Sequence, residues 1–304
     1  MKAVRYSTHG GPEVLEIVHI PIPEPGPNQV LVKVKASSVN PFDWKIRSGK
    51  VPKVQNLPRG TGMDASGIVD AVGEGVTDVV VGDEVFGLAA NREAVAEYAL
   101  LHHWGKKPAS MSWVQAAALP LAVETALRAI RLSGAKKGDT VLLDGASGSV
   151  GAAAVQFATD LGIKVIGTAS EERADFLWDI GAVPIAHGDG LAERIAEVAP
   201  EGIDLVWDFS GRMIPELIEL VGDPDKVTGI VDHQLGRELG IRDTSASETV
   251  GAFDALGEAA RLFEEGRFQI ALGPIFSLEQ TGEAQEANRL GTHAGKLIIE
   301  VDEA

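Results

Sequence analysis

The sequence predicts an α/β protein in which a domain with a doubly wound parallel sheet interrupts a β-rich domain. Three observations support this prediction. Short β-type segments, separated by turn residues, fill the first third of the chain. After residue 111, helix-type and strand-type patterns alternate, as in a parallel sheet with helices on both faces. A final strand pattern at 295–301 indicates that the β-rich domain resumes at the end of the chain.

The first part of the chain contains six candidate strands, at 1–6, 14–22, 30–39, 66–72, 83–88 and 97–101. Segment 30–39 alternates apolar and polar residues over its first half, as a half-exposed strand does. Turn sequences rich in glycine and proline separate these strands, at 9–12, 23–27 and 73–75. Short strands with frequent turns predict a compact, barrel-like β domain.

The middle of the chain begins with an Ala- and Leu-rich helical pattern over 112–132. A short apolar strand, 140–143, then runs into a glycine-rich segment and a helix over 152–161. The later elements are a strand at 164–168, a helix at 171–180, and strands at 203–209 and 227–231. This alternation predicts a parallel sheet.

The chain has 304 residues, 45% of them hydrophobic, which suits two domains with buried cores. Its formal net charge of −17 disfavours nucleic acid as a partner, because an acidic protein repels a polyanion. The absence of cysteine excludes disulfides, thiolate nucleophiles and cysteine-bound zinc. We find neither a signal-peptide pattern nor an apolar run of about 18 residues, so we expect a soluble, cytoplasmic protein that does not contact membranes.

The glycine-rich segment 145–151, with the sequence GASGSVG, lies between a predicted strand and a predicted helix. In dinucleotide-binding folds the pyrophosphate meets a helix N-terminus here, and glycines allow a tight turn and a close approach of the backbone. The strand and helix around it make this interpretation stronger than the glycines alone would. The alternative is a glycine-rich turn without a ligand. The predicted cofactor-binding residues are Gly145, Ala146, Ser147, Gly148, Ser149, Val150 and Gly151.

The end of the next strand distinguishes NAD from NADP. An acidic residue there would bind the ribose 2′-hydroxyl of NAD, but Ala169 occupies the expected position. Ser170 can donate a hydrogen bond to a 2′-phosphate, and Arg173 can pair with it. We therefore expect NADPH as the cofactor. The alternative for Arg173 is a solvated charge in the first turn of a helix.

Several segments have the order and spacing of motifs from a known family. They are VNPFDWKIR at 39–47, GTGMDASGIV at 60–69, GDEVFG at 82–87, AALPL at 117–121 and GK at 295–296. The chain resembles the zinc-free quinone oxidoreductases of the medium-chain dehydrogenase/reductase superfamily. The resemblance implies a GroES-like catalytic domain at 1–113 and 271–304, a Rossmann NADP-binding domain at 114–270, and an active site in the cleft between them. It also implies a homodimer formed through the cofactor-domain sheets. Segment 227–231 is a candidate edge strand for that dimer, and the alternative is an internal strand.

The sequence departs from the zinc alcohol dehydrogenases of the same superfamily. Their catalytic cysteine would fall near Val39 or Pro41, and their His-Glu pair corresponds to Met63 and Asp64. The adjacent pair His102-His103 makes a poor chelate, because neighbouring side chains on a strand point to opposite faces. We therefore expect no metal. Without a Lewis acid on the oxygen, a conjugated acceptor such as a quinone or enone is favoured, because conjugation spreads the charge left by hydride addition.

The predicted catalytic residues are Asn40, Asp43 and Lys45. The resemblance places this asparagine against the nicotinamide and the substrate, so Asn40 is also a candidate cofactor ligand. Lys45 stands where many quinone oxidoreductases have tyrosine, and the Asp-Trp-Lys run favours enones, since alkenal-reducing relatives often share it. In the alternative interpretation, Asn40 and Pro41 start a turn and Asp43 caps a short helix.

The resemblance implies further cofactor contacts from Thr125, His187, Phe209, Ser210 and Lys296. Phe209 and Ser210 follow a strand at the carboxyl edge of the predicted sheet, where ligands bind in open α/β folds. The alternatives are an ordinary helical hydroxyl for Thr125, a surface loop residue for His187 and a solvated lysine for Lys296. Asp232 beside His233 is unusual at the end of the strand 227–231.

These observations favour a zinc-independent enzyme that uses NADPH to reduce a small quinone or an α,β-unsaturated carbonyl compound. One alternative is an enoyl-thioester reductase, which would need a long pocket with a basic mouth for its carrier. Another is a non-catalytic protein that binds or senses NADPH.

Overall fold

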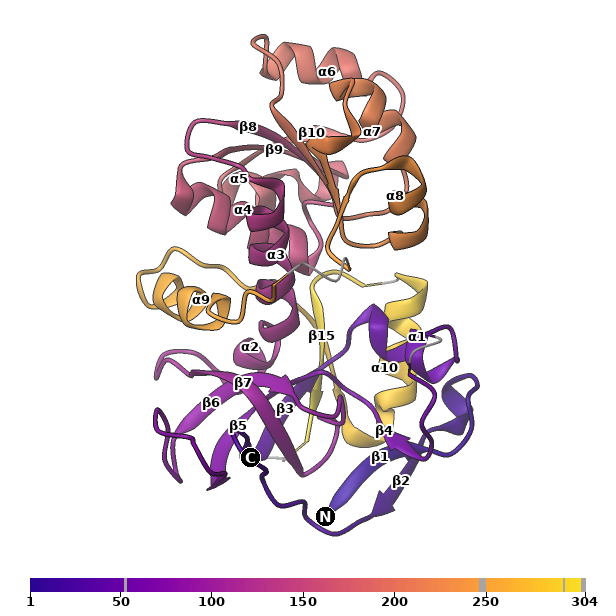
Figure 1. The fold of residues 1–304 in the computed structure, drawn as a ribbon, viewed down its shortest axis with the longest axis vertical. Helices are drawn as coiled ribbons and strands as arrows, with labels where there is room; N and C mark the ends of the chain where they lie inside the picture. Colours follow the sequence, from indigo (N-terminus) through magenta and orange to yellow (C-terminus); the bar gives the residue numbers. More distant parts are fainter. Residues whose placement is uncertain (52–53, 246–249, 292, 302–304) are drawn as a thin grey trace. The chain divides into compact units, whose positions relative to one another are not determined.

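A computed structural model describes residues 1–51, 54–245, 250–291 and 293–301 (Figure 1). The chain forms two compact units. The first comprises residues 1–121, 256–266 and 270–304, and the second comprises residues 122–255 and 267–269. The domain division predicted from the sequence differs in part, because residues 114–121 and 256–266 pack with the first unit.

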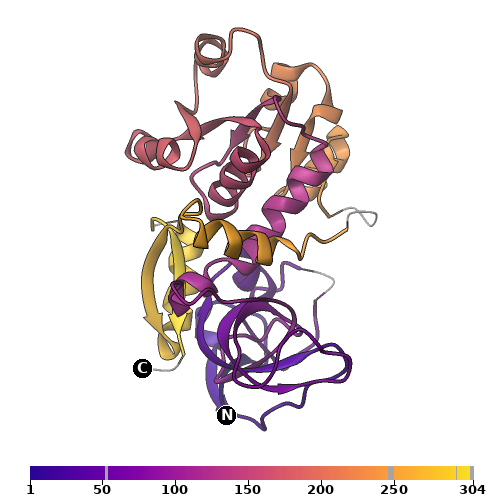
Figure 2. The same ribbon diagram turned by 90° about the vertical axis from the view of Figure 1, so that its left-hand side faces the viewer.

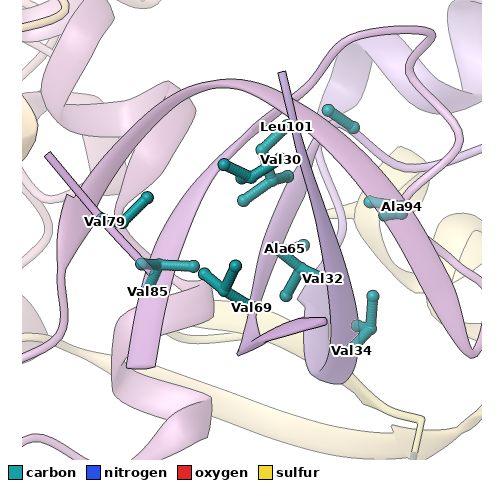
Figure 3. Packing of buried hydrophobic residues seen from close by; sticks show 11 residues of the cluster. Val30, Val32, Val34, Ala65, Val69, Val79, Val85, Ala94 and Leu101 are labelled. Carbon is teal, nitrogen blue, oxygen red and sulfur yellow. The ribbon is translucent and has the colours of Figure 1, made fainter. Parts of the chain in front are cut away.

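The first unit is built on a curved six-stranded sheet with the order β14-β15-β3-β5-β6-β7 (Figure 2). Strand β7 also pairs with β3, so these strands close into the predicted barrel. The strands are β3 (Val30–Ser38), β5 (Asp64–Val72), β6 (Glu84–Ala89), β7 (Tyr98–Lys106), β14 (Leu272–Ser277) and β15 (Lys296–Glu300). Apolar side chains from β3, β5, β6 and β7 fill the interior, among them Val32, Val69 and Val85 (Figure 3).

A three-stranded sheet and several short helices complete this unit. The sheet has the order β2-β1-β4, from β1 (Lys2–Tyr6), β2 (Glu16–His19) and β4 (Arg59–Gly60). The helices are η1 (Pro12–Val14), α1 (Pro41–Arg47), α2 (Trp113–Ala117), α9 (Ala255–Glu264), η4 (Leu278–Gln280) and α10 (Thr281–Leu290). The sequence patterns missed α9, α10 and the edge strand β14.

The second unit contains the predicted parallel sheet, with the order β10-β9-β8-β11-β12-β13. All five pairings between these strands are parallel. The strands are β8 (Thr140–Asp144), β9 (Lys164–Ala169), β10 (Ala182–Ala186), β11 (Leu205–Asp208), β12 (Val227–Gly229) and β13 (Arg242–Asp243). Four of the five residues of β8 are buried, as expected for a central strand covered on both faces.

Helix α3 (Pro120–Ser133) precedes the first strand of this sheet. The helices that connect its strands are α4 (Ser149–Leu161), η2 (Glu171–Arg173), α5 (Ala174–Asp179), α6 (Leu191–Val198), α7 (Ile214–Val221), η3 (Pro224–Lys226) and α8 (His233–Leu239). The single helix predicted over 112–132 is two helices, α2 and α3, because Pro120 cannot continue a preceding helix and instead begins the next one. In the described part of the chain, no helix combines the length and apolarity needed to span a bilayer.

The structure corrects the expectation that segment 227–231 forms an edge strand for a dimer. Strand β12 lies between β11 and β13, so its hydrogen-bonding groups already face strands of the same chain on both sides. The internal alternative was right, because the short strand β13 follows α8 and covers the edge of β12.

Candidate functional site

The glycine-rich loop, residues 145–151, connects β8 to α4 at the carboxyl edge of the parallel sheet. Gly145 has a φ of 83°, a left-handed conformation that glycine adopts without steric cost. Gly148 is the N-cap of α4. The loop therefore has the strand–turn–helix arrangement that the sequence predicted, with backbone N–H groups at the start of the helix.

Two glycines of this loop differ in what the protein requires of them. A Cβ on Gly151 would lie 2.3 Å from the Gly145 carbonyl oxygen and 2.7 Å from the Ala146 Cα, so the turn itself requires glycine there. A Cβ on Gly148 would meet nothing closer than the Gly145 oxygen at 3.5 Å, an ordinary contact. The fold does not need glycine at 148, whereas a ligand that approaches the backbone closely would.

Asp144, at the end of β8, ties together three chain segments beside the loop. It accepts a hydrogen bond from Thr168 Oγ1 at 2.6 Å and another from the Ser210 hydroxyl. Thr168 Oγ1 in turn accepts from the Gly145 N–H at 3.2 Å. The predicted cofactor residue Ser210 thus lies beside the loop. The sequence patterns missed Asp144, although its place directly before Gly145 was a usable signal.

The carboxyl ends of β9 and β10 bring together the residues predicted to bind the phosphate on the cofactor's ribose. Ala186 pairs with Ala169 in the sheet, so His187 and Ser170 each follow at the same edge. Both are exposed, and Arg173 is half-buried in η2. No described residue forms an ion pair with Arg173, which leaves its guanidinium available to an anion.

Phe209 and Asp208 lie at the carboxyl end of β11, next to β8. Phe209 is 9% exposed, and its ring stacks on that of Trp207. Asp208 is fully buried, and its Oδ1 accepts from the Gly211 N–H at 2.8 Å. Burial raises the pKa of Asp208, and the nearby Asp144 adds to the effect. Its Oδ2 has no partner in the described part of the protein, and the sequence analysis did not identify this residue.

A buried polar cluster in the first unit, the Asp64 cluster, consists of Ser38, Asn40, Asp64 and Lys296. Asp64 Oδ2 accepts from Ser38 Oγ at 2.6 Å and from Asn40 Nδ2 at 2.7 Å. Lys296 Nζ donates to Asn40 Oδ1 at 2.5 Å and lies 3.6 Å from Asp64 Oδ2. Lys296 is only 6% exposed, so the interpretation of this lysine as a solvated side chain was wrong.

The side-chain nitrogen and oxygen of Asn40 both form hydrogen bonds in this cluster, and one N–H of the amide is not used by them. Its amide nitrogen carries two hydrogens, and one of them bonds Asp64. The second N–H remains for a ligand. The oxygen, held by Lys296, fixes the orientation of the amide.

Asp43 contributes to the helix cap, as the alternative interpretation expects, but as the third helical residue of a capping box whose N-cap is Asn40. Its Oδ2 accepts from the Asn40 backbone N–H at 2.7 Å, at the start of α1. Burial raises the pKa of Asp43 to about 7, and the nearby Asp64 carboxylate adds to the effect. The capping contact therefore positions Asn40 through the backbone.

Two other predicted residues lie apart from these contacts. Lys45 is half-buried, and its ammonium group lies 5.8 Å from the centre of the Trp44 ring. Thr125, in α3, donates a long hydrogen bond to the adjacent Glu124 at 3.4 Å. No hydrogen bond or ion pair among the described residues joins Lys45 to the Asp64 cluster, and the roles of Lys45 and Thr125 toward a ligand remain predictions.

His233 and Asp243 form a second polar group at the carboxyl edge of the parallel sheet. His233 Nδ1 lies 2.6 Å from Asp243 Oδ1, and Arg237 also pairs with this carboxylate. Burial raises the pKa of Asp243, but hydrogen bonds from Ser245 and the contact with His233 outweigh it and hold the pKa below its usual value. Within the described ranges, no group of three or more His, Cys, Asp or Glu side chains is arranged to hold a metal.

Comparisons with known proteins agree with this architecture. Residues 26–108 match the family model described as the alcohol dehydrogenase GroES-like domain. The quinone oxidoreductase of Lama guanicoe is 34% identical in an alignment that covers 98% of this chain and 97% of that protein. The chloroplastic NADPH-dependent alkenal/one oxidoreductase of Arabidopsis thaliana is 33% identical, over 76% of this chain and 62% of that protein. The structure of Escherichia coli quinone oxidoreductase complexed with NADPH superimposes with a TM-score of 0.82 at 25% identity, over 99% of this chain and 100% of that one.

Proposed function

Since the chain belongs to the quinone oxidoreductase family of the medium-chain dehydrogenase/reductase superfamily, we propose that it is a zinc-independent reductase that uses NADPH to reduce a small quinone or an α,β-unsaturated carbonyl compound. The observation that carries the proposal is the glycine-rich loop. Gly148 has room for a side chain within the protein, so its lack of one fits a pyrophosphate that lies against the backbone. The N–H groups at the start of α4 are suited to bind that anion.

The cofactor preference rests on the carboxyl ends of β9 and β10. Ala169 offers no carboxylate to repel a 2′-phosphate, and Ser170 and Arg173 offer a hydroxyl and a cation without an ion-pair partner in the described chain. His187 lies at the same edge and can add a donor. Hydrogen bonds to a charged group contribute about 1.5–3 kcal/mol each, enough to discriminate NADPH from NADH. The NADPH named in relatives and neighbouring structures supports the same preference.

The Asp64 cluster supports a reaction without zinc. The His-Glu pair of the zinc enzymes corresponds in sequence to Met63 and Asp64. The ammonium group of Lys296 lies 3.6 Å from the Asp64 carboxylate. A divalent cation at this carboxylate would be repelled by the lysine. Since both groups are buried, this repulsion is only weakly screened.

The bound cofactor would supply a hydride, and the residues of the chain would orient the acceptor and bind its oxygen. Asn40 retains an N–H donor whose direction is fixed by Asp64 on one side and Lys296 on the other. A donor held in this way stabilises charge that develops on a carbonyl oxygen, because it does not have to reorganise during the reaction. We assign Asn40 this hydrogen bond, Lys296 and Asp43 the positioning of Asn40, and Lys45 a position near the acceptor. Thr125, Phe209 and Ser210 are assigned to the cofactor.

The proposal is tested by following oxidation of NADPH and of NADH, with an aromatic 1,2-quinone and separately with a short-chain enone, in metal-free buffer with and without chelator. We expect turnover that favours NADPH and survives the chelator, and the faster acceptor identifies the substrate class. Arg173→Ala should raise the KM for NADPH by about tenfold to a hundredfold and leave that for NADH unchanged.

The matched control is Lys226→Ala, which removes an exposed cation at the opposite, amino-terminal end of β12. Its kinetics should equal those of the wild type. Faster turnover with NADH would overturn the NADPH assignment, and loss of activity with chelator would overturn zinc independence. If neither acceptor reacted, the reductase assignment itself would be wrong.

A further inference from the structure

His233 is held by a carboxylate that three other hydrogen bonds fix in place. Its Nδ1 lies 2.6 Å from Asp243 Oδ1, and the Asp243 side chain is only 5% exposed. This carboxylate also accepts from the Ser245 N–H at 2.9 Å, Ser245 Oγ at 2.8 Å and Arg237 at 3.0 Å, with the arginine further contacting the Ser245 hydroxyl. An ordered carboxylate of this kind orients an imidazole ring and fixes which of its nitrogens donates to the carboxylate.

The other ring nitrogen, Nε2, is left for a ligand. Asp243 accepts only, so Nδ1 must carry a hydrogen and donate it. No described residue bonds Nε2, and the His233 side chain is 39% exposed. The ring is thus fixed at one nitrogen and open at the other. Acid–base histidines have this arrangement.

The sheet order puts this histidine in the half of the sheet where the proposed cofactor would place its nicotinamide. The chain leaves β8 toward β9 and β10 on one side, and then returns to build β11, β12 and β13 on the other. In doubly wound folds a dinucleotide crosses this switch point, with one mononucleotide on each half. The predicted 2′-phosphate residues lie on β9 and β10, which leaves the nicotinamide for the half that carries His233 and Asp243.

Local contacts connect His233 with the loop after β11. A Cβ on Gly211 would lie 2.9 Å from the Val231 side chain, so the segments that follow β11 and β12 are adjacent. Ser210, in the first of these segments, bonds Asp144 beside the glycine-rich loop. His233 follows Val231 by two residues, at the same carboxyl edge of the sheet.

We propose that His233, oriented by Asp243, donates the proton that completes reduction of the acceptor; this inference rests on the proposed reductase function. Reduction of an enone adds a hydride with its two electrons to the β carbon, oxidises the cofactor and shifts the conjugated pair onto the oxygen. The Nε2–H bond of the imidazolium then breaks and an O–H bond forms, which gives the enol. The neutral imidazole keeps its Nδ1 hydrogen on Asp243 and recovers a proton from water. With a quinone the same proton completes the hydroquinone.

The kinetic test compares His233→Gln, which keeps an amide donor of similar reach but cannot transfer a proton, with the wild type. We expect kcat for either acceptor to fall about 100-fold, the scale of general acid catalysis, while the equilibrium affinity for NADPH is unchanged. Added imidazole should restore part of the activity of His233→Ala. Asp243→Asn should also lower kcat, and imidazole should not rescue it, because its histidine is still present. His19→Gln, an exposed histidine on β2, is the matched control and should match the wild type.

Nuclear magnetic resonance tests whether His233 lies beside the bound cofactor, and it does so independently of turnover. In protein with ¹⁵N-labelled histidine, we expect the His233 spectrum to show a protonated Nδ1, and NADP⁺ should shift its Nε2 resonance in the wild type. No shift with saturating NADP⁺, or a full kcat in His233→Gln, would overturn the inference while leaving the proposed function intact. Absence of turnover by the wild-type protein with both acceptors would overturn the proposed function and the proton-donor role together.

Discussion

At the scale of single residues, the Asp64 cluster shows how burial turns common side chains into an ordered donor. Asp64 is fully buried, and its charge is supported by Ser38, Asn40, the Leu121 N–H and Lys296. A buried carboxylate without such partners would be strongly destabilising. Each partner is therefore tied to the others, and Asn40 has little freedom to turn its amide. This rigidity is what a hydrogen-bond donor to a reacting oxygen requires.

Asp43 gives a prediction at the same scale. Its folded-state pKa of about 7 lies above its ordinary value of 3.8, so between these values the folded protein binds more protons than the unfolded chain. The contribution of Asp43 to stability is thus complete below pH 4 and is lost as the pH rises to about 7. Asp43→Asn removes this titration and keeps an oxygen for the Asn40 N–H.

We expect the difference in free energy of unfolding between the wild type and Asp43→Asn to change by up to about 4 kcal/mol over this pH range, in favour of the variant at the higher pH. Urea unfolding at several pH values measures it. The exposed Asp70 of β5 supplies the control, Asp70→Asn. Parallel pH profiles for wild type and Asp43→Asn would contradict the prediction.

At the scale of elements, the segment from β8 through the loop to α4 contains two kinds of glycine. The fold requires some of them, and a bound ligand would require another. Gly145 takes a left-handed conformation, and Gly151 packs against the backbone of the turn. Gly148 has neither a left-handed conformation nor a close backbone neighbour that would exclude a side chain. The same element carries Asp144, which fixes the loop against β9 and the segment after β11.

The two glycine positions therefore make a matched pair of variants. Gly148→Ala should change the free energy of unfolding by less than about 1 kcal/mol, because its Cβ has room, and should weaken NADPH binding at least about tenfold. Gly151→Ala should cost about 1–3 kcal/mol or more in stability, because its Cβ overlaps backbone atoms. Thermal unfolding and a fluorescence titration with NADPH measure the two effects. Equal NADPH affinity in Gly148→Ala and the wild type would remove the main support for a cofactor at this loop.

At the scale of the whole molecule, the chain forms two units, and each has its own apolar core. A ligand that binds one unit stabilises that unit by mass action, and the size of the effect reports affinity independently of turnover. The net charge of −17 opposes anionic ligands in general, so the cofactor depends on local donors such as Arg173 and the helix N–H groups.

NADPH should therefore protect the protein more than NADH does. At 100 times its Kd, a ligand adds about 2.7 kcal/mol, which corresponds to an increase in Tm of about 5 °C or more for a unit of this size. We expect this increase with NADPH, a smaller one with NADH at the same concentration, and a smaller difference between the two in Arg173→Ala. Differential scanning calorimetry measures all three. An equal increase with both cofactors in the wild type would contradict the assigned 2′-phosphate site.

The sequence by itself determined the fold class and most strands, because both depend on local patterns. The alternation in β3, the buried run of β8 and the glycine spacing at 145–151 are each readable within one window of the chain. The placement of Ser170, Arg173 and His187 at one edge also follows from strand order alone. Pro120 is a local signal that divides the long predicted helix, because proline cannot continue a preceding helix.

Only the tertiary structure decided which polar groups meet. Lys296 and Asn40 are 256 positions apart, and Asp64 comes from a third element, so no local pattern could show that they share hydrogen bonds. The partners of His233 and the internal place of β12 likewise depend on β13, a strand of two residues too short to give a sequence signal. Periodicity records which face of an element is buried, whereas the site is made by side chains that distant elements bring to one place, where burial makes their pairing obligatory.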